Sequence, residues 1–503
     1  MKLLFNRRTL LKIFIGYIHV CLLCLAVAGT SFGHNLDSRV QKFTLKNGIR
    51  ILVLERNISP TASFYIRHKV GAVDDGCSQT GMAHFLEHMR FKGTTSLGTN
   101  DYEKESKILE AIDQIIQLLD VENAKENPDT ERIGQLEEEL KKLSREQEQY
   151  VIANEIDRLY TENGAVHMNA STGYDLTTYH VSLPSNKMEL WARIESDRLL
   201  NPVFRGFMPE RKVIIEEREQ TVESNPERKL MELFLATAFT VHPYRRPILG
   251  WKSDMPHLNK NYMKEFYRTY YVPENTVIAV VGNVVASDVV SLINRYFGGM
   301  SATPLPHVRI ADEPPQAGER RVALVAEAEP RLIIGYQKPT MPSNDDYVFD
   351  LIDVILSGGR SSRLYKRLVK DKGIASEVET ANGFPGARYS NLFAVFASPK
   401  APYKNTELES ALYEEIEALK NTTVGADEMK KAKNQIKADF VRSLSSNSGL
   451  AGMLSYFEAL TGDYRYITNY LDRIEKVSPE EVMKVAATYL TSKNRTVALL
   501  QKD

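Results

Sequence analysis

The feature that most constrains this chain is one short segment, His84-Phe85-Leu86-Glu87-His88. On a helix, its two histidines leave the same face one turn apart, which is the separation that tetrahedral zinc needs from two nitrogen ligands. Glu87 reaches the same end of that helix. A carboxylate there can accept the proton of a zinc-bound water and return it to a leaving amine. The segment therefore predicts a helix that carries the chemistry of metal-assisted amide hydrolysis.

A catalytic zinc also needs a third protein ligand and keeps one position open. The candidates lie on a predicted helix that begins near Pro209: Glu210, Glu216, Glu217, Glu219 and Glu223. An acidic helix is also typical of a solvated surface, and two histidines one turn apart also occur on amphipathic surface helices. Glu210 and Glu217, however, are seven residues apart and share one helix face. Glu217 is thus placed to bind the metal while Glu210 orients a histidine.

Composition narrows the function classes further. The chain has 503 residues with 64 Lys+Arg against 65 Asp+Glu, a net charge of −1, so nothing draws it to nucleic acid. Hydrophobic residues make up 43%, which is typical of a globular protein with a large core. Of the three cysteines, Cys21 and Cys24 lie in the N-terminal apolar segment and Cys77 is expected to be a small buried hydrophobe. A disulfide framework and a cysteine-rich zinc site are both excluded.

The N-terminus has the pattern of an export signal. Basic residues come first, an apolar run covers residues 10–28, and small residues at Ala26 and Ala28 provide a cleavage site. We therefore predict a signal peptide over residues 1–33 and an exported, periplasmic protein. The alternative is an uncleaved segment that anchors the chain in the membrane through residues 10–28. Only in that case is a membrane a partner.

Two similar segments suggest that the chain is internally duplicated. Residues 271–282 and 489–500 each contain a Tyr, a short loop, an Asn and a β-branched run. Each follows a long helical stretch and ends one part of the chain, with a Pro- and Gly-containing linker at 298–318 between the parts. The mature part opens with a predicted hairpin whose Asn47-Gly48 is typical of a type I′ turn.

Residues 102–162 differ from the rest, because they are very rich in Glu, Lys and Gln. Ile133, Leu136, Leu140 and Leu143 follow the spacing of a coiled-coil seam, which predicts a charged helical hairpin. Two interpretations remain open for it. It either connects elements as a surface-laid helix pair or docks a partner.

Several segments together resemble the pitrilysin/insulinase family of zinc metallopeptidases, and within it the mitochondrial-processing-peptidase-like branch. The segments are 84–94, 169–172, 210–217, 242–244, 271–275 and 362–364. The resemblance implies an α+β fold of two homologous α/β-sandwich halves that close like a clamshell, each a sheet with helices on one face. Residues 38–297 would form the catalytic zinc-binding half, with 102–162 inserted in it, and residues 319–503 the homologous half without zinc.

The same resemblance implies a role for each site residue. His84, His88 and Glu217 would be the ligands of a single zinc ion, and Glu87 the general base. Glu210 would be the carboxylate behind a histidine ligand. In this family the peptide substrate adds as a strand to the edge of the first sheet, which implies backbone contacts at three positions. These are Asn169, Ala170 and Ser171.

One departure from the family pattern concerns the second half. Family members that work as single chains place an Arg and a Tyr near the substrate carbonyl, where this chain has Val369 and Ser376. Neither side chain can donate the charged or phenolic hydrogen bond that this pair gives to a developing oxyanion. We therefore predict a zinc-dependent endopeptidase for short or unfolded peptides that acts as the zinc subunit of a heterodimer, with a homologous subunit supplying the Arg/Tyr pair.

Alternatives to this heterodimer remain. The chain forms a homodimer, or Arg360, or Arg388 with Tyr389, replaces the missing pair within the chain. The alternative function is a catalytically weak zinc-binding assembly subunit whose coiled hairpin docks partners.

Overall fold

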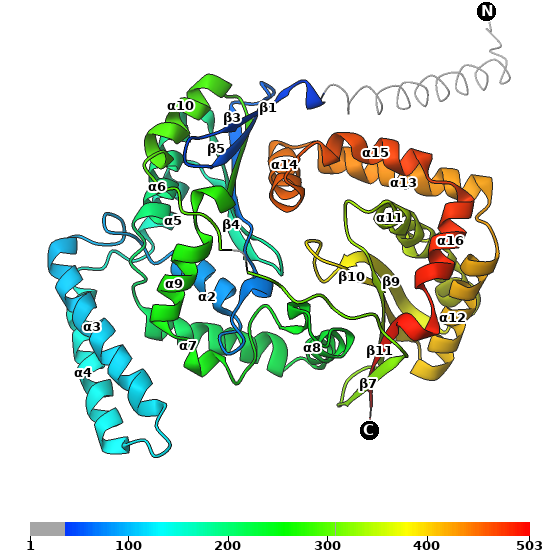
Figure 1. Ribbon diagram of the computed structural model, residues 1–503, viewed down its shortest axis with the longest axis horizontal. Helices are drawn as coiled ribbons and strands as arrows, with labels where there is room; N and C mark the ends of the chain where they lie inside the picture. The colour runs from blue at the N-terminus through cyan, green and yellow to red at the C-terminus, as the bar shows by residue number, and fades with distance from the viewer. Residues whose placement is uncertain (1–35, 307, 503) are drawn as a thin grey trace, which may run out of the picture.

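The computed structural model describes residues 36–306 and 308–502, arranged as two sheet-and-helix halves (Figure 1). The predicted signal peptide and the alternative anchor lie outside the described residues. Among the residues that are described, no helix has both the length and the apolar character needed to cross a bilayer.

A six-stranded sheet forms the centre of the first half, in the order β1-β2-β6-β3-β5-β4. The strands are β1 Val40–Thr44, β2 Arg50–Glu55, β3 Thr61–His68, β4 Val166–Thr172, β5 Thr177–Pro184 and β6 Thr276–Gly282. Strands β2 and β6 are parallel, whereas the other neighbours are antiparallel. Because β4 is last in the order, one of its sides is an open edge.

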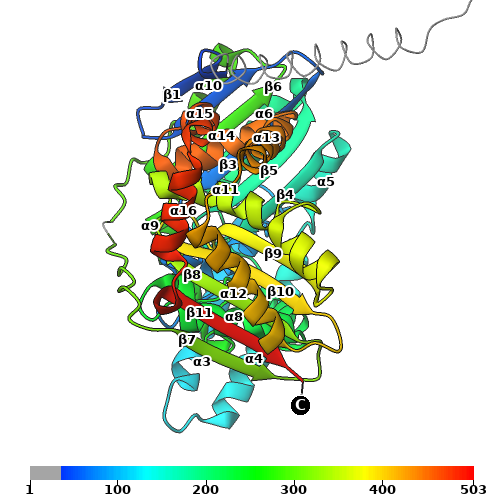
Figure 2. The ribbon, with the colours of Figure 1, turned by 90° about the vertical axis from the view of Figure 1, so that its right-hand side faces the viewer.

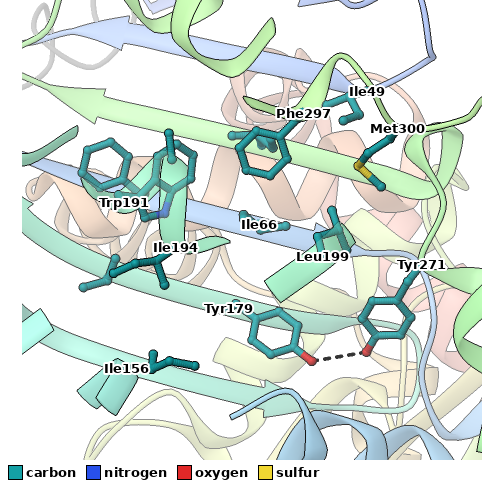
Figure 3. Packing of buried hydrophobic residues seen from close by; sticks show 14 of the residues in the cluster. Ile49, Ile66, Ile156, Tyr179, Trp191, Ile194, Leu199, Tyr271, Phe297 and Met300 are labelled. Atoms are coloured by element: carbon teal, nitrogen blue, oxygen red, sulfur yellow. Dashed lines mark hydrogen bonds between the residues drawn. The ribbon is translucent and has the colours of Figure 1, made fainter. Parts of the chain in front are cut away.

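The helices of this half are α2 Met82–Met89, α5 Glu155–Glu162, α6 Met188–Leu200, α7 Phe207–Arg218, α8 Pro226–Ala238, α9 Lys260–Tyr270 and α10 Ala286–Phe297. All of them except α8 cover one face of the sheet. Their shared core with the sheet contains the stacked rings of Trp191 and Phe64, whose centroids are 4.5 Å apart. The hydroxyls of Tyr179 and Tyr271 lie 3.3 Å apart in the same core (Figure 3).

The second half repeats this arrangement. Its strands are β7 Arg320–Val325, β8 Arg331–Lys338, β9 Ala375–Phe384, β10 Asn391–Pro399 and β11 Arg495–Gln501. Their order, β7-β11-β8-β10-β9, and their directions match β2-β6-β3-β5-β4 of the first sheet. The predicted fold class, two homologous α+β halves, is therefore confirmed, and β1 is the extra strand of the first half.

The helices of the second half are α11 Asn344–Ser357, α12 Asn405–Asn421, α13 Ala426–Ser443, α14 Asn447–Thr461, α15 Tyr466–Lys476 and α16 Pro479–Tyr489. Figure 2 shows α12 and α16 lying over one face of the second sheet. Between α10 and β7 the described residues form no helix or strand.

The two similar segments seen in the sequence have the same structural role. Asn275 precedes β6, and its side-chain amide donates to the carbonyls of Lys69 and Tyr270. Asn494 precedes β11 and donates in the same way to the carbonyls of Gln337 and Tyr489. The structural counterpart of Tyr489 is thus Tyr270, one residue earlier than the sequence comparison suggested.

One helix of each half packs against the sheet of the other half. Helix α8 of the first half packs its Phe234 against the second sheet, where a Cβ on Gly335 of β8 would come within 2.5 Å of the Phe234 ring. Helix α14 of the second half packs Leu454 against Val277 and Ala279 of the first sheet. The halves are therefore joined by two buried apolar contacts, and each sheet has a helix of the other half on its second face (Figure 1).

The charged segment forms a helical hairpin that projects from the body (Figure 1). We call α3 Tyr102–Asn123 and α4 Thr130–Glu148 the arm. Its two helices pack through Leu119 and Leu136, as the seam predicts. The arm ends at Glu148 and does not extend to residue 162, because Ile156 and Tyr160 of α5 belong to the core of the first half.

Two smaller expectations differ from the structure. Gly48 has φ +103°, but Asn47 does not share this left-handed conformation, so the hairpin turn is not type I′. The Asn47 side chain instead donates to the carbonyl of Phe297, which ties the turn to the end of α10. Cys77, expected in the core, is exposed.

We expect Glu458→Ala to loosen the contact between the halves. Glu458 is fully buried on α14 and pairs with Lys42 at 2.8 Å and Arg50 at 3.3 Å, both from the first half. Removing the carboxylate leaves Lys42 and Arg50 with one backbone carbonyl each, those of Gly462 and residue 458, and should cost about 1–3 kcal/mol of unfolding free energy. Urea denaturation measures the loss, and hydrogen exchange should show lower protection in α14. Glu475→Ala, at an exposed site on α15, is the control, and equal stability of both variants would contradict the prediction.

Candidate active site

The structure brings His84, His88 and Glu217 together. The two imidazoles leave α2 on one face, with ring centroids 4.7 Å apart. Glu217 approaches them from α7, with one carboxylate oxygen 3.9 Å from Nε2 of His84 and the other 3.6 Å from Nε2 of His88. Among the described residues, this is the single group of three His, Cys, Asp or Glu side chains placed to hold one metal ion.

Other acidic residues of the same segment do not join this group. Glu219 pairs with Lys252 at 3.1 Å. Glu223 lies 3.2 Å from Arg218. Glu216 is exposed and is not part of the group. Of the five acidic candidates, the structure therefore places Glu217 and Glu210 at the histidines, in agreement with the helix-face argument.

Glu210 lies behind His88. Its carboxylate is 2.9 Å from Nδ1 of His88 and 2.5 Å from the ammonium of Lys92. With Nδ1 donating to Glu210, Nε2 of His88 is left facing Glu217. The hydrogen bond to Glu210 raises the pKa of His88. Burial favours a higher pKa for Glu210, but the bonds from His88 and Lys92 outweigh it, and the pKa of Glu210 is lowered.

Glu87 lies at the same end of α2 as the histidines, next to the edge strand β4. The hydroxyl of Thr172, the last residue of β4, donates to its carboxylate at 2.6 Å. Burial raises the pKa of Glu87, and the Thr172 bond opposes that rise. Burial also lowers the pKa of His84 to about 3, so this imidazole is neutral at physiological pH, the form that binds a metal.

Both ends of α2 are held by buried groups. At its start, the carboxylate of Asp75 accepts from the backbone N–H of Gly81 at 2.7 Å and of Ala83 at 2.9 Å. Directly after its end, the guanidinium of Arg90 is fully enclosed, 4.3 Å from the ring centroid of Tyr179. The orientation of the histidines is thus set by contacts outside the helix.

The three predicted substrate-contact positions lie on the open edge. Asn169, Ala170 and Ser171 are in β4, which pairs only with β5. Asn169 and Ala170 also line a cavity of about 560 Å³ that includes Glu87 and His88. The unpaired backbone of β4 thus runs past the His–Glu group.

Several residues at this site had no assigned role in the sequence analysis. Thr172 and Lys92 lie inside segments that carried the resemblance, but no spacing rule indicated their contacts. Asp75 and Arg90 approach α2 from a loop and from its own end, and only the folded chain shows what they contact. An Asp six residues before the N–H that it accepts from is a weak signal in any sequence.

The second half contributes no Arg/Tyr pair at Val369 and Ser376. Val369 packs against the core of that half, and the Ser376 hydroxyl donates to the Ser398 carbonyl at 3.2 Å. Arg388, named as a substitute, pairs with Asp74 at 3.0 Å. The ring of Tyr389 lies against His242, with centroids 5.0 Å apart. Arg388 and Tyr389 thus form part of the contact between the halves.

We expect Asp75→Ala to disturb α2. It leaves two backbone N–H groups without their acceptor, which should cost about 1–3 kcal/mol of unfolding free energy. It should also lower zinc affinity, because the histidines lose their fixed orientation. Chelator competition and denaturant unfolding measure the two effects. Ser78→Ala, at an exposed site in the same loop, is the control, and unchanged stability with unchanged affinity would refute a positioning role for Asp75.

Comparison with known proteins shows which family models match the chain. Two family models match it: "Insulinase (Peptidase family M16)" over residues 51–114 and 130–252, and "Peptidase M16 inactive domain" over residues 257–436. The 15 residues left out between the first two segments, 115–129, form the outer end of the arm.

Named relatives agree with these models. The zinc protease PqqE of Helicobacter pylori is 26% identical over 474 residues, covering 92% of each chain. An uncharacterised zinc protease of Mycobacterium leprae is 24% identical over 463 residues, covering 90% of each.

Solved structures share the fold. A protease from Helicobacter pylori has a TM-score of 0.76 at 23% identity, covering 92% of this chain and 99% of that one. The periplasmic protease PqqL of Escherichia coli has a TM-score of 0.68 at 14% identity, and this chain spans 47% of its length. The solved structures share the fold, and the family models show that the chain belongs to the M16 (insulinase) family of peptidases.

Proposed function

We propose that this protein is a zinc-dependent endopeptidase that hydrolyses short or unfolded peptides. The observation that carries the proposal is the convergence of His84, His88 and Glu217, with Glu87 beside them at an open strand edge. The relatives named as zinc proteases support it. We also assign the chain to the mitochondrial-processing-peptidase-like branch, on the segments quoted from its sequence.

The three side chains suit zinc. Two imidazole nitrogens and one carboxylate are a known ligand set for catalytic zinc. Bond lengths of about 2.0–2.1 Å place ligand atoms of a tetrahedral site roughly 3.4 Å apart, and here one ligand atom from each of the three residues lies within 4.8 Å of the others. His84, His88 and Glu217 would hold one ion, which acts as a Lewis acid and lowers the pKa of a water toward about 7.

Glu87 is the proposed general base. Its carboxylate takes a proton from the attacking water and delivers it to the amine that leaves when the peptide bond breaks. Thr172 holds this carboxylate at 2.6 Å and so fixes where the proton is received. Glu210 keeps His88 in the tautomer that presents Nε2 to the site.

The substrate enters as an extended strand. Its backbone pairs with the open edge of β4 at Asn169, Ala170 and Ser171, which brings the peptide bond past Glu87. A folded protein offers no free strand of this kind, and the halves on either side restrict access. These features favour short or unfolded peptides.

A second subunit completes the site in this proposal. Val369 has no hydrogen-bond donor, and the hydroxyl of Ser376 already donates to the carbonyl of Ser398. Arg388 is engaged with Asp74. A homologous subunit with an Arg/Tyr pair would supply the donor, and a homodimer is the alternative arrangement. The same observation supports the second candidate function, a catalytically weak zinc-binding assembly subunit whose arm docks partners.

We further propose that the protein is exported to the periplasm. The support is the basic and apolar pattern of residues 1–33 and the fold shared with a periplasmic protease of Escherichia coli.

Glu87→Gln should abolish hydrolysis and leave zinc in place. The change removes the base but none of the three ligands, so we expect a loss of about 10²–10⁴-fold in kcat/KM with one zinc still bound. Fluorogenic peptides measure the rate, and elemental analysis counts the metal. His88→Ala is the matched variant that should lose both. Wild-type hydrolysis that persists in Glu87→Gln would refute the assignment.

The isolated chain should be slow, and the homologous subunit should accelerate it. Loss of one oxyanion donor typically costs about 10²–10³-fold in rate, and we expect a gain of that order when the partner is added. A Tyr→Phe change in the partner should remove most of the gain. If the chain alone reaches full activity, or if that change has no effect, the heterodimer proposal fails.

A further inference from the structure

The cavity at the candidate active site does not end at β4. It continues away from Glu87 and His88 and reaches the base of the arm. Four apolar arm residues line this far end: Leu109, Ile112, Ile116 and Leu140. Phe207 and Met208, at the start of α7, line it as well. The arm is therefore one wall of the same cavity that contains the proposed base.

The base of the arm is fixed to the body, as a cavity wall requires. Glu105 of α3 is fully buried and accepts two hydrogen bonds from the guanidinium of Arg205, at 2.7 and 2.8 Å. The same guanidinium donates to the Thr94 carbonyl at 2.6 Å, in the loop that follows α2. Farther out, Asp113 of α3 pairs with Lys260 of α9 at 2.5 Å. Buried ion pairs of this kind hold a fixed geometry.

The cations around the cavity leave no free partner for an acidic occupant. Its three cations are all engaged: Lys92 by Glu210, Arg205 by Glu105, and Lys260 by Asp113. A carboxylate entering the far end would find no free cation. The lining also includes Glu148, Glu155 and Asp157, but the wall that the arm contributes at Leu109, Ile112, Ile116 and Leu140 is aliphatic. The volume, about 560 Å³, is ample for a leucine or an aromatic ring.

We infer that the arm builds an apolar subsite, which binds one large apolar side chain of the peptide close to the bond that is cut. This inference rests on the proposed function, because that function places the peptide along β4. It gives the arm a role that neither interpretation of the sequence contained. The arm selects substrates, in addition to any contact that its exposed outer end makes.

A binding experiment tests the inference without requiring hydrolysis. The probes are fluorescein-labelled peptides of Gly, Ser and Ala with one central residue, either Ala, Leu, Phe or Asp. They are titrated by anisotropy against the zinc-loaded Glu87→Gln chain. Burying a Leu or Phe side chain should tighten binding about 10- to 100-fold over Ala, and Asp should bind no better than Ala. Equal affinity for Phe and Ala would overturn the inference.

Substitutions in the arm then locate the subsite. Ser144 lines the cavity from α4, so Ser144→Phe should fill it and remove most of the preference for Phe. Arg145→Phe, at the next and exposed position, is the matched control and should keep the preference. If Ser144→Phe does not fold, Ile112→Ala enlarges the cavity and should shift the preference from Leu toward Phe. A preference that survives every change at the arm would refute its role.

The two proposals fail separately. If the wild-type chain hydrolyses peptides without preferring a large apolar residue, the subsite is refuted and the peptidase stands. If the Glu87→Gln chain prefers Phe and Leu but the wild-type chain hydrolyses nothing, even with its partner, the peptidase is refuted and the subsite stands.

Discussion

The apposition of α2 and α7 is the contact on which the candidate active site depends. Two imidazoles from one helix meet two carboxylates from the other, with Glu210 at 2.9 Å behind His88 and Glu217 in front. Lys92 and His88 offset the charge of the buried Glu210 carboxylate. Asp75 and Arg90 hold α2 from its two ends. These surrounding contacts therefore offset the free energy that it costs to bring the ionisable groups together.

The chain has two similar halves, but only the first carries the proposed metal ligands and general base. The sheets share strand order, and the helix that follows β8, α11, corresponds in order to α2 after β3. Helix α11 contains no histidine, and among the described residues only the first half has a metal-holding group. The second half instead supplies α14 to the first sheet and receives α8 in return. The second half therefore contributes to the fold and not to the metal-holding group. The match of residues 257–436 to the inactive-domain model is consistent with this.

Much of the fold and the site was predictable, because it depends on local patterns. Helix α2 and the arm follow from apolar and ionisable spacing, and Asn275 and Asn494 marked the repeat. The choice of Glu217 and Glu210 among five acidic residues followed from a shared helix face. Errors arose where tertiary contacts decide. The arm was assigned residues as far as 162 because charged composition does not distinguish a projecting helix from α5, whose Ile156 and Tyr160 are buried in the core.

The sequence by itself indicated the family, the side chains that can meet a metal, the one that can move a proton, and the division of the chain into two similar halves. These follow from residue type and from spacing along a helix, which are local properties. Only the tertiary structure decided that Thr172 holds Glu87, that α8 and α14 are exchanged, and that the arm closes one end of the cavity. Such contacts join residues far apart in the chain. They depend on how whole elements pack, and no local pattern encodes that packing.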